Sequence, residues 1–154
     1  MDTPADDRTP ALLRGRPSWL LTHLATQVGH VLGAAFDAGE FRRYHYALLA
    51  ALDEFGPGSQ ATLGRRCRID RSYVVEAVNE LAARGLVHRA PDSADRRRNV
   101  ITLTPEGRAQ LDRMSRTLDD VQDTVTAPLS AAERAQLTGY LDRMLDHLQA
   151  QRRG

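Results

Sequence analysis

The chain has 154 residues, of which 42% are hydrophobic and 27% are charged. This composition can bury a core and excludes an intrinsically disordered chain, and the length predicts about one domain. No apolar run approaches the roughly 20 residues that cross a bilayer, and the N-terminus has no apolar signal segment. The single cysteine, Cys67, excludes an internal disulfide and a multi-cysteine zinc site. We therefore expect a cytoplasmic protein without a membrane partner.

Residues 1–16 contain Asp6, Asp7 and two prolines and offer little to bury, so we expect a disordered tail. From Pro17 apolar residues recur at helical spacing, which predicts helices at 18–36 and 40–55, the second ended by Gly56-Pro57-Gly58. Ser59 and Asp70 are suited to cap two short helices, 60–66 and 71–84. Two short helices joined by a tight turn predict a helix-turn-helix.

A β-hairpin and two further helices are predicted next. Residues 86–89 and 100–103 are β-like, and the turn between them carries three consecutive arginines. Thr104-Pro105 begins a long helix, and a capping box from Ser130 to Glu133 begins the last one. Both helices carry apolar seams with spacings of three and four, which favour packing on another helix: Leu111, Met114, Leu118, Val121 and Val125, then Leu137, Leu141, Met144 and Leu148.

Arginine supplies all 21 basic residues and is unevenly distributed. Residues 59–104 carry nine arginines against five carboxylates, whereas both flanking segments are slightly acidic. Such a stretch is the electrostatic footprint of a protein that binds a polyanion, although a solvated charged face gives the same pattern. The charge therefore indicates nucleic acid as a partner only in combination with the helix-turn-helix.

The order of these elements and four sequence blocks resemble the MarR family of bacterial transcription regulators. The blocks are 59–64, 69–75, 81–89 and 95–107, and the last resembles the Asp-Arg core and Leu-Thr strand end of the family's wing. The resemblance covers about residues 18–150. It implies a mostly α winged helix-turn-helix with N- and C-terminal dimerisation helices. The DNA-binding lobe would span 41–104, and the dimerisation region 17–40 and 105–150.

In such a fold the helix at 71–84 enters the major groove, where its first turns face base edges. Arg71 would read guanine or hold a phosphate, and Glu76 would accept from a cytosine amine or orient an arginine. The wing would reach the minor groove, which favours guanidinium. The predicted DNA-binding residues are Ser59, Gln60, Arg71, Ser72, Tyr73, Glu76, Asn79, Arg96, Arg97 and Arg98. The alternative interpretation is that these residues form a solvated charged surface that binds no DNA.

The resemblance implies that one arginine of the wing lies in the minor groove. Alternation along a strand puts Arg96 and Arg98 on one face and Arg97 on the other, so we expect Arg97 at the tip. Asp95 would form a salt bridge with a neighbouring arginine and stiffen the hairpin.

The resemblance also implies a small aromatic or phenolic anion as effector. Pockets for such ligands combine aromatic rings with a few polar groups. The candidate ligand-binding residues are Trp19, His23, Phe41, Tyr44 and His45. The alternative interpretation is that these aromatic residues, which recur at helical spacing, belong to the hydrophobic core.

Cys67 lies between Arg66 and Arg68, which would lower the pKa of its thiol and favour redox sensing. The alternative is a buried structural cysteine. The five histidines lack metal-ligand spacing, and the chain has no nucleophile elbow or phosphate loop. We therefore expect no metal site, no cofactor and no enzymatic activity.

The sequence thus predicts a homodimeric, sequence-specific double-stranded-DNA-binding regulator, most often a repressor in this family. Two protomers related by a two-fold axis would present two recognition helices to a palindromic operator. Two alternatives stay open. One is a non-specific architectural nucleic-acid binder, and the other is a protein–protein interaction module that uses the helical seams.

Overall fold

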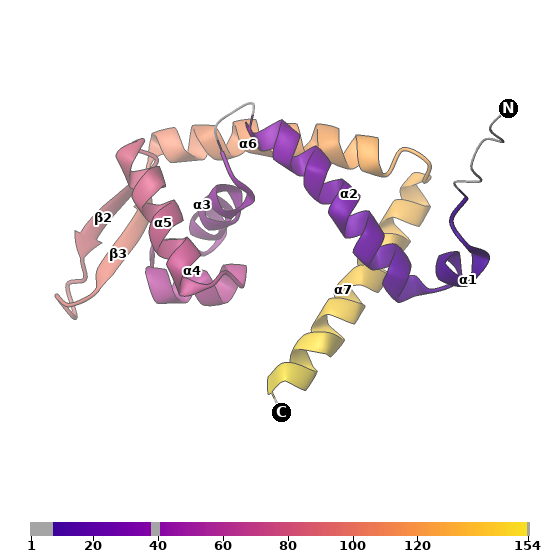
Figure 1. Ribbon diagram of the computed structural model, residues 1–154. Helices are drawn as coiled ribbons and strands as arrows, with labels where there is room; N and C mark the ends of the chain where they lie inside the picture. Colours follow the sequence, from indigo (N-terminus) through magenta and orange to yellow (C-terminus); the bar gives the residue numbers. More distant parts are fainter. Residues whose placement is uncertain (1–7, 38–40, 154) are drawn as a thin grey trace, which may run out of the picture. The chain divides into compact units, whose positions relative to one another are not determined.

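The computed structural model describes residues 8–37 and 41–153 (Figure 1). The chain divides into two compact units, Met1–Leu118 and Asp119–Gly154, and we describe each by itself. Within the described ranges no helix is long and apolar enough to cross a membrane.

The first unit begins with α1 (Ala11–Arg14) and α2 (Pro17–Asp37). α1 is a single exposed turn inside the predicted tail, so this part of the tail has local order without burying apolar area. Residues 1–7 of that tail, and the first residue of the predicted helix 40–55, lie outside the described residues. α2 matches the predicted helix at 18–36. Its Phe36 is buried, whereas Leu20, Leu24 and Val31 remain exposed.

Three helices form the core of the first unit: α3 (Arg43–Phe55), α4 (Gln60–Cys67) and α5 (Arg71–Ala83). They pack around side chains that are almost fully buried, namely Leu48, Leu49, Leu63, Val74, Val78 and Leu81. Burying each of these contributes about 2 kcal/mol to folding.

The two predicted N-caps of the helix-turn-helix differ. Ser59 Oγ accepts the backbone N–H of Thr62 at 3.2 Å, so the predicted cap of α4 is confirmed. Asp70 immediately precedes α5, but its side chain makes no capping hydrogen bond to the described first turn, so that predicted cap is wrong. The correct residue type at the correct position is therefore not enough, because the side chain must also turn toward a free amide.

Three short strands form an antiparallel sheet in the order β1-β3-β2: β1 (Gly58–Ser59), β2 (Val87–Pro91) and β3 (Asn99–Leu103). Val87 pairs with Leu103 at the base of the β2–β3 hairpin, and Pro91 pairs with Asn99 at its far end. Sequence reasoning missed β1, because two residues give no alternating pattern. The hairpin projects beyond α4 and α5 as a narrow wing (Figure 1).

The start of α6 (Pro105–Val125) packs closely against the turn that follows α5. Thr104 Oγ1 accepts the backbone N–H of Gly107 at 3.0 Å, which confirms the predicted helix start. A Cβ added at Gly107 would overlap the carbonyl oxygen of Leu86 and lie 2.8 Å from Cδ1 of Leu103. Only glycine therefore fits at this point of the helix.

The predicted seam of α6 is in part intramolecular. Leu111 and Met114 are buried in the core of the first unit, and the half-buried Leu118 packs against that core. These residues stabilise the fold of one protomer, whatever else the helix contacts.

The second unit contains the end of α6 and α7 (Ala131–Arg153). Ser130 and Glu133 form the predicted capping box, with backbone N–H bonds of 2.7 Å to Glu133 Oε2 and 3.3 Å to Ser130 Oγ. The hydrogen bond from the Ser130 backbone N–H to the Glu133 carboxylate, followed by the effect of the Ser130 side chain, lowers the pKa of Glu133. Arg134 contacts Asp123 at 2.7 Å and so ties α7 to the end of α6. Large exposed apolar side chains follow along α7: Tyr140, Leu141, Met144, Leu145 and Leu148.

Candidate nucleic-acid interface

One face of α5 is solvent-exposed along the helix. The opposite face buries Val74, Ala77, Val78 and Leu81, whose spacing of three and four assigns one side of the helix to the core. The exposed positions include all five residues that the sequence predicted on this helix, namely Arg71, Ser72, Tyr73, Glu76 and Asn79.

A cleft of about 400 Å³ opens where the starts of α4 and α5 meet the wing loop. Four arginines line it: Arg65, Arg71, Arg97 and Arg98. Ser59 and Gln60 line it as well, so the structure brings together predicted residues from three separate segments. None of the described lining residues is acidic, and four guanidinium groups therefore give the cleft a concentrated positive potential. Sequence reasoning missed Arg65, which only the fold brings near the wing.

The wing loop, residues 92–98, is held by its own aspartates. Asp92 Oδ1 accepts the N–H of Ala94 at 2.9 Å, and Asp95 Oδ1 accepts the N–H of Arg97 at 3.0 Å. Asp95 Oδ2 also lies 3.7 Å from Nε of Arg98, which is the kind of ion pair expected for Asp95. Both carboxylates thus shape the loop that carries the arginines.

The strand alternation that set Arg97 apart from Arg96 and Arg98 is wrong, whereas its place at the tip stays a prediction. Residues 96–98 lie in the loop and not in β3, which begins at Asn99, so no pleat separates their side chains. Arg97 and Arg98 line the same cleft, and the exposed Arg96 is not among its lining residues.

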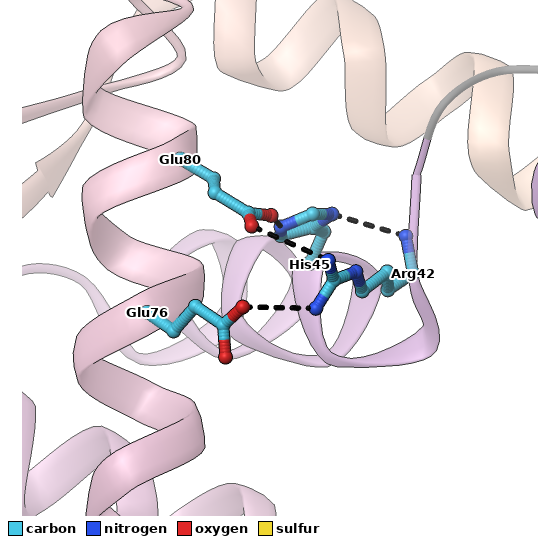
Figure 2. A network of polar contacts seen from close by, with 4 residues as sticks. All are labelled: Arg42, His45, Glu76 and Glu80. Carbon is cyan, nitrogen blue, oxygen red and sulfur yellow. Dashed lines mark hydrogen bonds and ion pairs between the residues drawn. The ribbon is translucent and has the colours of Figure 1, made fainter.

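A polar network that the sequence did not predict joins the start of α3 to α5 (Figure 2). His45 is 1% exposed; its Nδ1 accepts the backbone N–H of Arg42 at 3.0 Å, and its Nε2 lies 2.7 Å from Oε2 of Glu80. The guanidinium of Arg42 lies 3.1 Å from Glu76 Oε1 and 3.6 Å from Glu80 Oε1. Glu76 is therefore engaged by an arginine, as in the second of its two predicted roles.

Two other exposed residues of α5 are also held by neighbours. Asn79 Oδ1 accepts from Nη2 of Arg89 on β2 at 2.6 Å. The ring of Tyr73 stacks on Tyr44 of α3, with 5.2 Å between the centroids and 28° between the planes. Tyr44 was predicted to bind a ligand, but in this structure it supports Tyr73.

The five candidate ligand residues do not gather at one place. Trp19 and His23 stack on each other along α2 with centroids 4.3 Å apart, and Tyr44 packs on Tyr73. The predicted ligand role of His45 does not fit, because the ring is buried and both of its nitrogens face protein atoms.

Phe41 is the one candidate that lines a cleft of about 280 Å³ in the first unit. The other residues that line this cleft are Ala35, Phe36, Gln110, Arg113, Met114 and Thr117. Arg113 supplies the positive charge there, and its Nε donates to Gln110 Oε1 at 3.0 Å. Sequence reasoning missed Arg113, because no local pattern links α6 to the segment before α3.

Cys67 does not have the lowered pKa expected from its neighbours. Burial raises the pKa of its thiol by more than the nearby Arg66 lowers it, and Sγ–H donates to the carbonyl oxygen of Ala47 at 3.3 Å. The expectation based on flanking arginines is therefore wrong, since desolvation of the thiolate dominates. Among the residues described, no cluster of three or more His, Cys, Asp or Glu side chains is suited to hold a metal ion.

Comparison with known proteins identifies the family. The model of the MarR family matches residues 42–98, which cover α3, the helix-turn-helix and most of the wing. The transcriptional repressor NicR of Pseudomonas putida is 31% identical over 131 residues, which cover 78% of this chain and 83% of that protein. The chain belongs to the MarR family.

Solved structures of MarR-type regulators share the fold of this family member. BpsR of Bordetella bronchiseptica, whose DNA binding is regulated by 6-hydroxynicotinic acid, matches with a TM-score of 0.78 at 25% identity, over 90% of this chain and 99% of that chain. PcaV of Streptomyces coelicolor, solved with its natural ligand, matches with a TM-score of 0.74 at 30% identity, over 90% and 98%. The mostly helical winged helix-turn-helix and the role in transcription regulation are thus as predicted.

Proposed function

We propose that this MarR-family regulator is a repressor that binds a specific double-stranded DNA site as a homodimer. The observation that carries the proposal is the cleft in which Arg65, Arg71, Arg97 and Arg98 converge beside the exposed face of α5. Guanidinium groups neutralise phosphates, and a helix of this length fits the major groove. Both features lie at the junction of α5 and the wing.

The predicted DNA-binding residues take different roles in this proposal. Ser59 and Gln60 hold phosphates at the start of α4, and Arg65 holds one from its last turn. Arg71, Ser72 and Tyr73 face base edges. Arg96, Arg97 and Arg98 serve the minor groove. Glu76 and Asn79 are engaged by Arg42 and Arg89, and this engagement supports an orienting role in place of base reading.

The homodimer is proposed from exposed apolar side chains outside the lobe 41–104. α2 exposes Leu20, Leu24 and Val31, and α7 exposes the five large apolar residues given above. Monomeric proteins rarely leave such rows in water, and a two-fold axis lets one surface cover its own copy. We therefore assign dimerisation to 17–40 and 105–150.

The proposed effector is a small aromatic anion held in the cleft of about 280 Å³. Phe36 and Phe41 supply apolar walls and Arg113 supplies a cation. The regulation of BpsR by 6-hydroxynicotinic acid supports this class of ligand. The effector would release DNA by favouring a dimer whose recognition helices are wrongly spaced, which requires different affinities for the two states.

Selection of duplexes from a random-sequence library by the purified protein tests the proposal. A selected duplex should then resist competition by a scrambled duplex of the same composition, at about physiological salt. Equal competition by the two duplexes would support the alternative of a non-specific architectural nucleic-acid binder. If the protein retains no duplex at all, the result would support the alternative of a protein–protein interaction module.

A further inference from the structure

The polar network of Figure 2 links the segment before α3 to the helix that we propose reads the major groove. We propose that Arg42 and His45 position α5 through Glu76 and Glu80, and that a proton on His45 releases this positioning. The inference rests on the proposed function, because its consequence is a change in sequence-specific DNA binding.

The hydrogen bond from Arg42 sets the tautomer of the neutral His45 ring. Nδ1 accepts the backbone N–H of Arg42 and therefore carries no hydrogen of its own. The hydrogen of the neutral ring then lies on Nε2, which faces the Glu80 carboxylate at 2.7 Å. This tautomer satisfies the Arg42 N–H and turns its own hydrogen-bearing nitrogen toward Glu80, although the 2.7 Å contact is not aligned as a hydrogen bond. The ring also completes the N-terminal cap of α3.

A proton on Nδ1 would place two donors against each other. The backbone N–H of Arg42 has no other side-chain acceptor in the described structure, so the cap of α3 would be lost. The charged groups around the ring act in both directions. Burial is the main cause that lowers the pKa of His45, Glu80 raises it, and Arg84 and Arg42 lower it further. His45 is therefore neutral at neutral pH and gains its proton in acid.

Loss of the cap would reach the exposed face of α5 by two routes. Arg42 contacts both Glu76 and Glu80, so its displacement leaves Glu76 without its ion-pair partner, while the charged ring of His45 takes over the contact with Glu80. Tyr44, which stacks on Tyr73, lies in the first turn of the same helix α3. We expect acid to weaken base reading more than it weakens phosphate contacts, because the arginine cleft does not include these residues.

The network also adjoins the cleft that contains Phe41. The Phe41 ring meets the His45 ring edge-to-face with centroids 5.8 Å apart, and the guanidinium of Arg84 lies 4.6 Å from the Phe41 ring centre. Phe41 thus lines the cleft and also contacts His45, which is one of the four side chains of the network.

His45→Gln is the variant that isolates the proton. A glutamine at this position can accept from the Arg42 N–H and donate to Glu80, but it does not titrate. The readout is the affinity for the duplex that the wild type selects from a random library, divided by that for a scrambled duplex, at about pH 7.5 and about pH 5.5. We expect this ratio to fall in the wild type by up to about tenfold per pH unit and to stay constant in His45→Gln.

The scrambled duplex and the variant control for other effects of acid. The remaining histidines are identical in both proteins, so they do not contribute to a difference between the variant and the wild type. If His45→Gln fails to fold by circular dichroism, Glu80→Gln provides a second test. Removal of that carboxylate should lower the pKa of His45 further, and the loss of specificity should then move to a more acidic pH.

The outcomes separate this inference from the proposed function. A wild type that selects a duplex but keeps a constant ratio in acid overturns the positioning role and leaves the proposed function intact. A hydrogen on Nδ1 at neutral pH, seen in imidazole ¹⁵N shifts of the DNA-free protein, also overturns it. A wild type that selects no duplex overturns the proposed function, and the positioning role with it.

Discussion

Arginine 97 shows how a single side chain contributes to the proposed interface. It lines the arginine cleft, and its backbone N–H is fixed by Asp95. In the proposed complex the Arg97 guanidinium lies in the minor groove and also neutralises phosphate charge, so Arg97→Ala should release about one counterion fewer on binding. The slope of log affinity against log salt should then become less steep by about one unit. Titrations of duplex at several salt concentrations measure this slope. Arg116→Ala removes the same charge from an exposed site on α6 and should leave the slope unchanged.

Cysteine 67 is expected to be unreactive in the folded protein. Its thiol is half-buried and donates to Ala47, and burial raises its pKa. Thiolate is the reactive form, so alkylation by iodoacetamide at about pH 7.5 should be slower in the native protein than in urea. Equal rates in the two states would show that the thiol is freely accessible.

At this scale the sequence predicted local contacts better than distant ones. The Ser130–Glu133 capping box and the Ser59 cap depend on residues three positions apart, and both formed. The contact of Arg42 with Glu76 spans 34 positions and depends on how α3 packs on α5. No rule based on sequence spacing predicts such a pair. The stack of Tyr44 on Tyr73 escaped prediction for the same reason, although both residues had been singled out for other roles.

At the scale of elements, the junction between the wing and α6 depends on Gly107. A methyl group there would overlap the Leu86 carbonyl and press on Leu103. We expect Gly107→Ala to lower the free energy of unfolding by about 3 kcal/mol, the upper part of the range for overpacking. Urea denaturation measures it. Gly139→Ala on α7 is the matched control, because its added methyl meets no described atom within 4 Å beyond its chain neighbours and the backbone of its own helix. It should stabilise by about 0.5–1 kcal/mol through helix propensity.

The helices were predicted closely, whereas the sheet was predicted only in part. Helices carry a periodic apolar pattern over many residues, and 17–37 and 105–125 contain enough turns to establish it. β1 has two residues and exists because β3 pairs with it. Strand alternation was applied to the wing arginines, although β3 begins at Asn99, after the last of them. The conformation of short segments at the ends of a hairpin depends on the geometry of the turn, and such segments are too short to show a periodic sequence pattern.

At the scale of the whole molecule, the proposed dimer is tested best on α7. Leu118 on α6 packs against the core of its own unit, so a charge there would damage the fold as well as any interface. Leu141 and Leu148 are 40% and 58% exposed. We expect the double substitution Leu141→Glu and Leu148→Glu to yield a folded monomer in sedimentation experiments, because two carboxylates cannot be buried against a second copy.

A control and a contrary result accompany this test. Gln136→Glu adds a charge to another exposed position of the same helix and should leave the dimer intact. If the doubly substituted protein still sediments as a dimer, α7 is not part of the interface, and the assignment of 105–150 to dimerisation fails.

The base and the end of the wing are anchored differently. At the base, Thr104 donates its backbone N–H to Leu86 at 3.1 Å and its hydroxyl to Gly85 at 2.7 Å, which connects the hairpin to the end of α5. The aspartate bonds described for residues 92–98 stay within the loop. In the proposed complex the base of the wing would thus keep a fixed position relative to α5, while the loop could change its conformation independently. One protein could then accept operators whose minor grooves differ in width without losing its major-groove alignment.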